Sequence, residues 1–177
     1  MLSLLSVLQI EAQKTIDLSG DWNFEIDRQD IGEKEKWFNQ TLQDVIELPG
    51  SMPERLKGDD VTVRTRWTGS LYDSSYYYNP YMEKYRREGN VKLPFFLTPD
   101  KHYVGVAWYQ KEINLPKDWK KERIVLVLER PHIESTVWVN GHKVGMQNSL
   151  CVAHIYDVTR YVPVSYTHLR AHETELH

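Results

Sequence analysis

The stretch STVWVNGHKVG, residues 135–145, is the clearest indication of the fold in this chain. Trp138 lies in the middle of a short apolar run, between Val137 and Val139, which suits a strand. Asn140-Gly141 is the strongest short signal for a two-residue turn, because both residues tolerate positive φ. The sequence therefore predicts a β-hairpin here.

Short strand patterns also occur on both sides of this hairpin. A run of apolar residues in 123–129 predicts a strand buried on both faces. Residues 33–42 are consistent with one short helix or a loop. The other segments that read as strands are 20–26, 44–48, 61–67 and 106–116. Many short strands and a single weak helix predict an all-β sandwich.

The segment TGSLYDSSYYYNPYMEKYRREGN, residues 68–90, is a long irregular region that carries six tyrosines. A compact domain seldom keeps so long a loop without a use. One interpretation is a lid or binding loop that supplies aromatic platforms, with Tyr77 and Tyr78 as candidate substrate contacts. The other is a loop whose tyrosines pack against the sandwich wall. The sequence leaves both open.

The composition is that of an ordinary globular domain, with 41% hydrophobic and 27% charged residues. A net charge of −3 lacks the basic footprint of a nucleic-acid-binding protein. The six tryptophans and eleven tyrosines suit a β-rich fold, and flat rings also suit stacking on sugars. The one cysteine, Cys151, excludes an internal disulfide.

The N-terminal residues MLSLLSVLQIEAQ, 1–13, form an apolar stretch too short to span a bilayer. They resemble the hydrophobic core of a secretory signal peptide, with cleavage near Ala12 or Gln13, although a positive n-region is missing. We therefore expect an exported protein, periplasmic or extracellular. The alternative is a loose N-terminal segment.

The C-terminal residues SYTHLRAHETELH, 165–177, contain three histidines. On a helix His168 and His172 would share a face, as paired zinc ligands do. The H-E-x-x-H zinc motif nevertheless fails, because His177 comes one residue too late. Residues 164–174, VSYTHLRAHET, resemble a translated sequencing adapter at every position. We therefore expect no metal site and exclude 164–177 from the fold as an artefactual, solvated tail.

Five motifs in order resemble the N-terminal sugar-binding, jelly-roll domain of glycoside hydrolase family 2, which includes β-galactosidases, β-glucuronidases and β-mannosidases. They are LSGDWNF (18–24), ELPGSM (47–52), AWYQKEINLP (107–116), VWVNGHKVG (137–145) and YDVT (156–159). The resemblance implies an all-β, galactose-binding-like β-sandwich over 14–163 that lacks its last strand or strands. Such a fragment would expose unpaired backbone and be marginally stable or insoluble on its own.

The resemblance also implies what the chain does. In the family both catalytic glutamates lie in a later (β/α)₈ barrel, and this chain has no Asn-Glu pair and no barrel pattern. We therefore expect no catalytic residue, cofactor or membrane span. The chain would be a non-catalytic, sugar-binding fragment of a retaining β-glycoside hydrolase, with carbohydrate and the missing C-terminal domains as partners. The alternative is a stand-alone carbohydrate-binding module or lectin.

The segment GMQNSL, 145–150, is the candidate sugar contact within that resemblance. In the family this loop reaches toward the active site of the neighbouring barrel. Asn148 corresponds to a position where β-galactosidases carry an aspartate that lines the sugar pocket, so here only hydrogen bonding is expected. Gln147 and Ser149 are weaker candidates, and the alternative is a polar turn.

Other residues whose side chains could take part in binding or catalysis are expected to be structural. The three tryptophans of the motifs, Trp22, Trp108 and Trp138, are expected in the core, with Trp108 and its neighbour Tyr109 on opposite faces of one strand. The histidines before and after the hairpin, His132 and His154, are expected to be ordinary hydrogen-bonded residues.

Overall fold

The computed structural model describes residues 14–62, 65, 75–91, 99–119, 122–131, 133–162 and 167–175. The chain is mostly strand with a few short helices, as the sequence predicted. The strands are β1 (Gly20–Asp27), β2 (Asp44–Leu48), β3 (Asp59–Asp60), β4 (Lys101–His102), β5 (Gly105–Ile113), β6 (Val125–Leu128), β7 (Glu134–Val139), β8 (His142–Asn148), β9 (His154–Asp157) and β10 (Thr167–Glu175). The helices are η1 (Trp37–Asn39), α1 (Ser75–Tyr78), η2 (Pro80–Tyr85), η3 (Lys117–Trp119) and η4 (Thr159–Tyr161).

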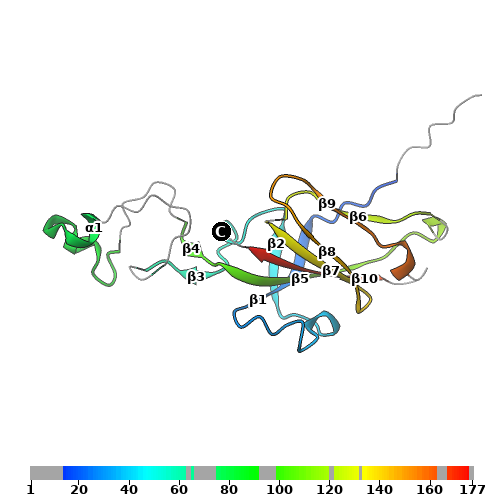
Figure 1. Ribbon diagram of the computed structural model, residues 1–177, viewed down its shortest axis with the longest axis horizontal. Helices are drawn as coiled ribbons and strands as arrows, with labels where there is room; N and C mark the ends of the chain where they lie inside the picture. The colour runs from blue at the N-terminus through cyan, green and yellow to red at the C-terminus, as the bar shows by residue number, and fades with distance from the viewer. Residues whose placement is uncertain are drawn as a thin grey trace, which may run out of the picture.

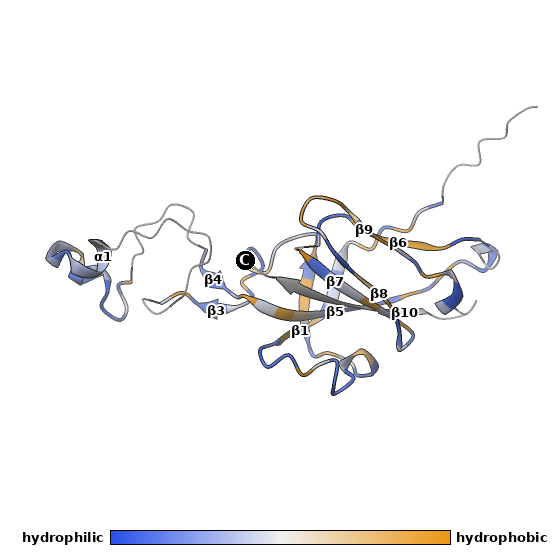
Figure 2. Cartoon of the chain, viewed as in Figure 1, coloured by the Kyte–Doolittle hydropathy of each residue, from blue (hydrophilic) through white to orange (hydrophobic). Residues whose placement is uncertain are grey.

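Six strands form one sheet in the order β2-β1-β5-β10-β7-β8, and each neighbouring pair is antiparallel (Figure 1). The two-stranded sheet β6–β9 contributes a second layer against one face of this sheet, where Leu126 and Tyr156 join the core cluster. A third pair, β3–β4, leads from the start of β5 toward the tyrosine-rich lobe of α1 and η2. Figure 2 shows β6 among the hydrophobic segments of the fold.

Each face of the six-stranded sheet carries its own cluster of buried side chains. The face toward β6 and β9 carries the larger cluster, which includes Trp22, Phe24 and Tyr109. The opposite face carries Trp108 and Trp138, which pack with Trp37 and Phe38 of η1. Trp108 and Tyr109 thus lie on opposite faces, and the core positions expected for the three motif tryptophans are confirmed.

The segment that covers the Trp108 face is held by a buried carboxylate. Asp27 is 2% exposed and accepts hydrogen bonds from the backbone N–H groups of Ile31 and Gly32, at 3.0 and 2.6 Å. The Trp108 indole donates to the same carboxylate at 3.2 Å. Each donor satisfies part of a carboxylate that would be costly to bury unpaired. Asp27 therefore fastens the turn after β1 onto the sheet.

The predicted hairpin is confirmed and contains one irregularity. Asn140 and Gly141 have φ of 51° and 79°, the positive values that a type I′ turn requires. The pairing shifts by one residue between Val137 and Trp138, which pair with Gly145 and Lys143. This β-bulge changes which residues face each other at the far end of the hairpin.

Two strand predictions are wrong in part. Within 61–67 the described residues Val61, Thr62 and Thr65 are not strand, and pairing ends at Asp60; the rest of that segment lies outside the described residues. The 123–129 segment forms β6, but Val127 is 49% exposed, so the strand is buried on one face only. The cause is that β6 lies in the outer layer and not inside the main sheet.

The C-terminal segment takes part in the fold, contrary to the expectation that 164–177 would be a solvated tail. Residues Thr167–Glu175 pair with β5 along their whole length and with β7 from Leu169 to Thr174. The segment is a strand, so the helical spacing considered for its histidines does not apply. Its resemblance to a sequencing adapter stays a prediction about its origin, and His177 lies outside the described residues.

Two further expectations concern a signal peptide and a membrane span. The candidate signal peptide, residues 1–13, lies outside the described residues. Among the helices in the described part of the chain, none has the length and apolar character needed to cross a bilayer.

Candidate functional site

The candidate site is a polar corner formed where β7 begins and β8 ends. Asn148, the last residue of β8, pairs in register with Glu134, the first residue of β7. The Asn148 side-chain amide donates from Nδ2 to Oε2 of Glu134 at 3.1 Å. Asn148 is exposed and Glu134 is half-buried, so the pair is open to a ligand.

Glu134 is a member of this corner that the sequence did not reveal. A simple count back from the Asn140-Gly141 turn places Gln147 opposite Glu134. The bulge after Val137 shifts the register by one, so the partner is Asn148. The carboxylate that Asn148 lacks is therefore present on the neighbouring strand.

A buried network behind the corner holds the turn that follows Asn148. The Ser149 N–H donates to the Ile133 carbonyl at 2.7 Å, and its own carbonyl accepts from Nε2 of His154 at 3.1 Å. Because a carbonyl only accepts, Nε2 is the donor to it, and Nδ1 lies 2.6 Å from the Ser135 hydroxyl. His154 is fully buried and hydrogen-bonded at both nitrogens, as predicted.

Tyr156 extends this network to β9. Its hydroxyl donates to the Ser135 carbonyl at 2.7 Å and lies 2.8 Å from the Ser135 Oγ. Burial raises the pKa of the Tyr156 phenol, so it stays neutral at physiological pH. The network ties β7 and β9 together beneath the turn and leaves Asn148 at its outer edge.

Gln147 has a different environment from the one expected for a sugar contact. Its side-chain Nε2 donates to the Ile155 carbonyl, and its Oε1 accepts from the Ile155 N–H at 3.2 Å. The amide thus replaces a pair of ladder hydrogen bonds between β8 and β9. This arrangement assigns Gln147 to holding the two strands together.

Several apolar side chains of β8, of β9 and of the turn between them are exposed. Met146, Leu150, Val152 and Ile155 are each between 55% and 62% exposed. In the ranges that the structure describes, no group of three His, Cys, Asp or Glu residues is arranged to hold a metal ion.

The tyrosine candidates lie in a second place, in the lobe of α1 and η2, which Figure 1 shows apart from the sandwich. Tyr77 is half-buried, with its ring 5.0 Å edge-on from that of Tyr76. Tyr78 is 81% exposed. The structure therefore does not bring the tyrosines and Asn148 into one cluster, and His132 lies outside the described residues.

A cavity of about 1440 Å³ lies between the layers. Apolar side chains such as Trp22, Ile113 and Leu128 line it, and the backbone segment 14–19 forms one edge. Its walls come from the face of the six-stranded sheet that β6 and β9 cover only in part. The cavity is thus an incompletely filled interior between layers.

Comparisons with known proteins agree with this architecture. The family model described as glycosyl hydrolases family 2, sugar binding domain, matches residues 15–170. A β-glucuronidase from Paenibacillus borealis is 26% identical over 144 residues, which cover 81% of this chain and 18% of the relative. The human β-glucuronidase is 41% identical over 44 residues, 23% of this chain and 7% of the relative.

A solved structure gives the same fold. The β-glucuronidase from Ruminococcus gnavus in complex with N1-substituted uronic isofagomine matches 97% of this chain and 24% of its own chain, with a TM-score of 0.64 and 18% identity. The chain thus spans about a fifth of the length of the Paenibacillus borealis relative. With a family model that covers most of its length, the chain belongs to glycosyl hydrolase family 2 and corresponds to the sugar-binding domain of that family.

Proposed function

We propose that this chain is the non-catalytic N-terminal domain of a longer, retaining β-glycoside hydrolase, and that its Glu134–Asn148 corner contacts the sugar. The single observation that carries the proposal is the hydrogen bond between Asn148 and Glu134 at an exposed corner. The relatives named β-glucuronidase support a β-glucuronide as the substrate of the longer protein. The pair of carboxylates that a retaining hydrolase needs, roughly 5–5.5 Å apart, would come from the rest of that protein.

The corner suits recognition of a hydroxyl group. Because Nδ2 of Asn148 donates to Glu134, the amide orientation is set and Oδ1 is the acceptor left for a sugar hydroxyl. The Glu134 carboxylate has further acceptor capacity beside it. The buried His154 and Ser135 beneath the turn keep both groups in place.

The cavity between the layers supports a further part of the proposal. We infer that one or more strands of the longer protein lie beside β6 and β9 and cover the apolar sheet face that lines the cavity. Export of the longer protein is a proposal that rests on the apolar residues 1–13 alone.

The test is a chimera in which residues 15–175, the matched segment extended to the end of β10, replace the matching domain of the Paenibacillus borealis β-glucuronidase. We expect a soluble chimera that hydrolyses 4-nitrophenyl β-D-glucuronide. Asn148→Ala should lower kcat/KM about tenfold through lost hydrogen bonding in the transition state. Val45→Ala, an exposed position on β2, is the matched control and should leave kcat/KM unchanged.

The outcomes separate the proposal from its alternative. A folded chimera whose kinetics are indifferent to Asn148→Ala and Glu134→Gln would remove the corner from sugar recognition. A stand-alone carbohydrate-binding module is the second candidate, favoured by the exposed Tyr78. It predicts that the chain alone binds a saccharide while no chimera regains activity.

A further inference from the structure

We propose that the lobe of α1 and η2 is a second saccharide-binding site, in which the rings of Tyr78 and Tyr81 stack on pyranose units of an extended sugar chain. The inference rests on the proposed function, because it places a longer stretch of the same ligand against the same end of the domain. It concerns side chains distinct from the Glu134–Asn148 corner.

The lobe has its own internal scaffold. Tyr76 is 1% exposed, and its hydroxyl donates to the Tyr85 carbonyl at 2.9 Å. The Arg86 guanidinium donates to the Tyr76 carbonyl and lies 6.0 Å from the centre of that ring. Asn90 donates to the Lys84 carbonyl at 2.8 Å. These contacts fold residues 75–91 around Tyr76.

Two tyrosines are turned out of this scaffold. Tyr78 and Tyr81 are 81% and 85% exposed, the highest values among the large hydrophobic side chains that the structure exposes. They flank Asn79-Pro80, and the Asn79 side chain caps η2 by accepting from the Tyr81 N–H at 3.0 Å. The cap fixes the backbone at the start of η2, which carries Tyr81. Two nearly fully exposed rings on an ordered turn form a surface that can stack on a ligand.

The strand register places the lobe and the polar corner at the same end of the six-stranded sheet. Val106 of β5 pairs with Thr174, which pairs with Glu134, which pairs with Asn148. Three strand spacings of about 4.8 Å separate the start of β5 from Asn148, roughly 14 Å. The β3–β4 stem of the lobe joins this end two residues before β5.

The stem is fastened to the body by charged and aromatic contacts. Arg28, just after β1, donates to the Asp59 carboxylate at 2.6 Å, and its guanidinium lies 5.8 Å from the Tyr103 ring centre. The Tyr103 hydroxyl donates to the Val106 carbonyl at 3.0 Å. The lobe therefore extends from the end of the sheet that carries the corner.

The charges of the lobe favour stacking over ionic recognition. The Arg87 guanidinium pairs with Glu83 at 3.1 Å, and Lys84 lies 4.8 Å from the Tyr85 ring centre. Arg86 is held by Tyr76. Each of these cations has a partner within the lobe, although Lys84 and Arg87 are exposed, and the two tyrosine rings are its most exposed apolar groups. Aromatic faces stack on the C–H faces of pyranoses, and the phenol hydroxyl can hydrogen-bond their hydroxyl groups.

The test uses the full chain in native gel electrophoresis through soluble polysaccharides, namely β-glucan, galactomannan, xylan and polygalacturonate. We expect retardation by at least one of them. The double variant Tyr78→Ala/Tyr81→Ala should weaken binding about tenfold or more, as for loss of aromatic anchors. Tyr78→Phe/Tyr81→Phe should retain most of it, since the stacking faces remain. Binding should persist in 0.5 M salt, because it is not ionic.

The matched control is Val45→Ala/Leu56→Ala, which removes two exposed apolar side chains of the body and should change nothing. The proposal is overturned if no polysaccharide retards the chain or if the alanine pair binds as the parent does. It is also overturned if the rings mediate self-association: sedimentation would then show an oligomer that the alanine pair converts to a monomer.

A second format keeps the test independent of the stability of the isolated chain. In the chimera, the alanine pair should raise KM for an oligosaccharide while leaving hydrolysis of 4-nitrophenyl β-D-glucuronide unchanged. An inactive chimera combined with ring-dependent retardation in the gels would contradict only the proposed function. An active chimera indifferent to both rings would contradict only the lobe.

Discussion

The β7–β8 hairpin and strand β10 are neighbours in one sheet, yet different interactions hold them. Ser135–Val139 of β7 are all buried, and Trp138 stacks on Phe38 with ring centres 5.5 Å apart. β10 pairs on both edges, with β5 and β7, but its sequence THLRAHETE is mostly polar. Its Glu173 pairs with Ala107 and Ser135, both 1% exposed.

The difference shows that backbone pairing and side-chain burial make separate contributions to the stability of a sheet. Backbone hydrogen bonds form with any sequence, and each contributes only about 0.5–1.5 kcal/mol net. Burial of apolar side chains depends on sequence and contributes about 1.5–3 kcal/mol for a large residue. A central strand normally reads as a nearly continuous apolar run. β10 thus combines the backbone pairing of a central strand with a mostly polar sequence, whereas the hairpin has a sequence suited to its place.

The largest expected effect comes from removing residues 163–177. Without β10, the edges of β5 and β7 would face each other unpaired in the middle of the sheet. We expect loss of cooperative urea unfolding, followed by circular dichroism and tryptophan fluorescence. Removal of residues 176–177 alone is the matched control and should leave the transition in place. An unchanged midpoint in the longer truncation would mean that the segment is an appended tail, as its sequence suggests.

The next effect tests the hairpin itself. Trp138→Ala removes a side chain that is 2% exposed and contacts both Phe38 and Trp108, so we expect a loss of about 3–5 kcal/mol in the free energy of unfolding. Trp119→Ala in η3 is the matched control, because Trp119 is half-buried at the edge of the cavity. This variant should lower the free energy of unfolding by only about 1 kcal/mol. Equal losses in urea titrations would contradict the view that the hairpin face is the better packed one.

Some of this fold could be predicted from sequence because the signals were local. The Asn140-Gly141 turn needs only two residues, and the alternation in β1 needs only its own strand. The place of β10 could not be predicted, because its polar sequence contradicts a central position. The register at the far end of the hairpin depends on a bulge that no turn residue marks.

The candidate sites also contain some residues that the sequence indicated and others that only the structure revealed. The resemblance to the family directed attention to Asn148, but Glu134 became visible only with the bulged register. The tyrosine-rich segment was evident from composition, whereas the identity of the outward rings depends on how the lobe folds around Tyr76. The family resemblance and the composition thus located one candidate region each, and tertiary packing decided which side chains face outward.

A smaller effect separates the contribution of the hairpin turn from that of its strands. Gly141 has φ of 79°, so Gly141→Ala should cost about 1–2 kcal/mol through left-handed strain. Gly89 has nearly the same φ, 78°, but lies in the tyrosine lobe, where an added Cβ meets nothing within 4 Å. Gly89→Ala should therefore leave the main thermal transition unchanged. If both variants shift it equally, the lobe and the sheet unfold as one unit.

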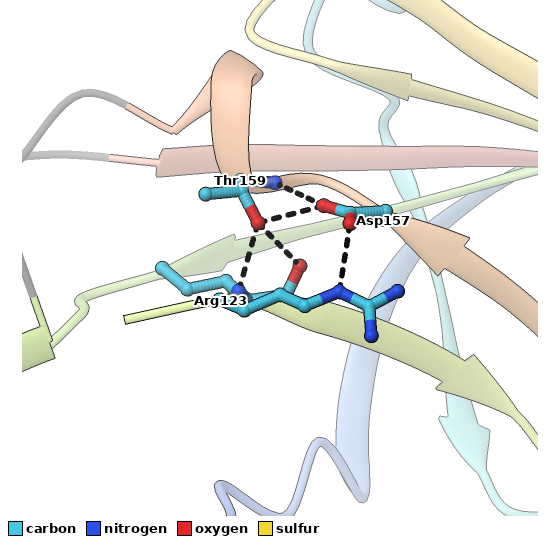
Figure 3. A network of polar contacts seen from close by, with 4 residues as sticks. Arg123, Asp157 and Thr159 are labelled. Carbon is cyan, nitrogen blue, oxygen red and sulfur yellow. Dashed lines mark hydrogen bonds and ion pairs between the residues drawn. The ribbon is translucent and has the colours of Figure 1, made fainter. Parts of the chain in front are cut away.

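The smallest expected effect concerns the outer layer that packs beside the hairpin. Asp157, at the end of β9, accepts from the Thr159 hydroxyl at 2.6 Å and from Arg123 Nε at 2.9 Å (Figure 3). These bonds lower the pKa of Asp157 from 3.8 to about 2. A lowered folded-state pKa stabilises the protein above the unfolded value and loses that contribution as the pH falls through the folded value.

Asp157→Asn should therefore lower Tm slightly at pH 5–7, and the difference from the parent should shrink between about pH 4 and pH 2. Thermal melts across this range measure it, with Asp30→Asn on an exposed turn as the control. Because the Asp157 side chain is half exposed and its partner Arg123 more so, the effect should stay far below that of Trp138→Ala. A Tm difference that is constant down to pH 2 would mean that the charge of Asp157 does not couple β6 to β9, and that this layer, unlike β10, is held by its apolar face alone.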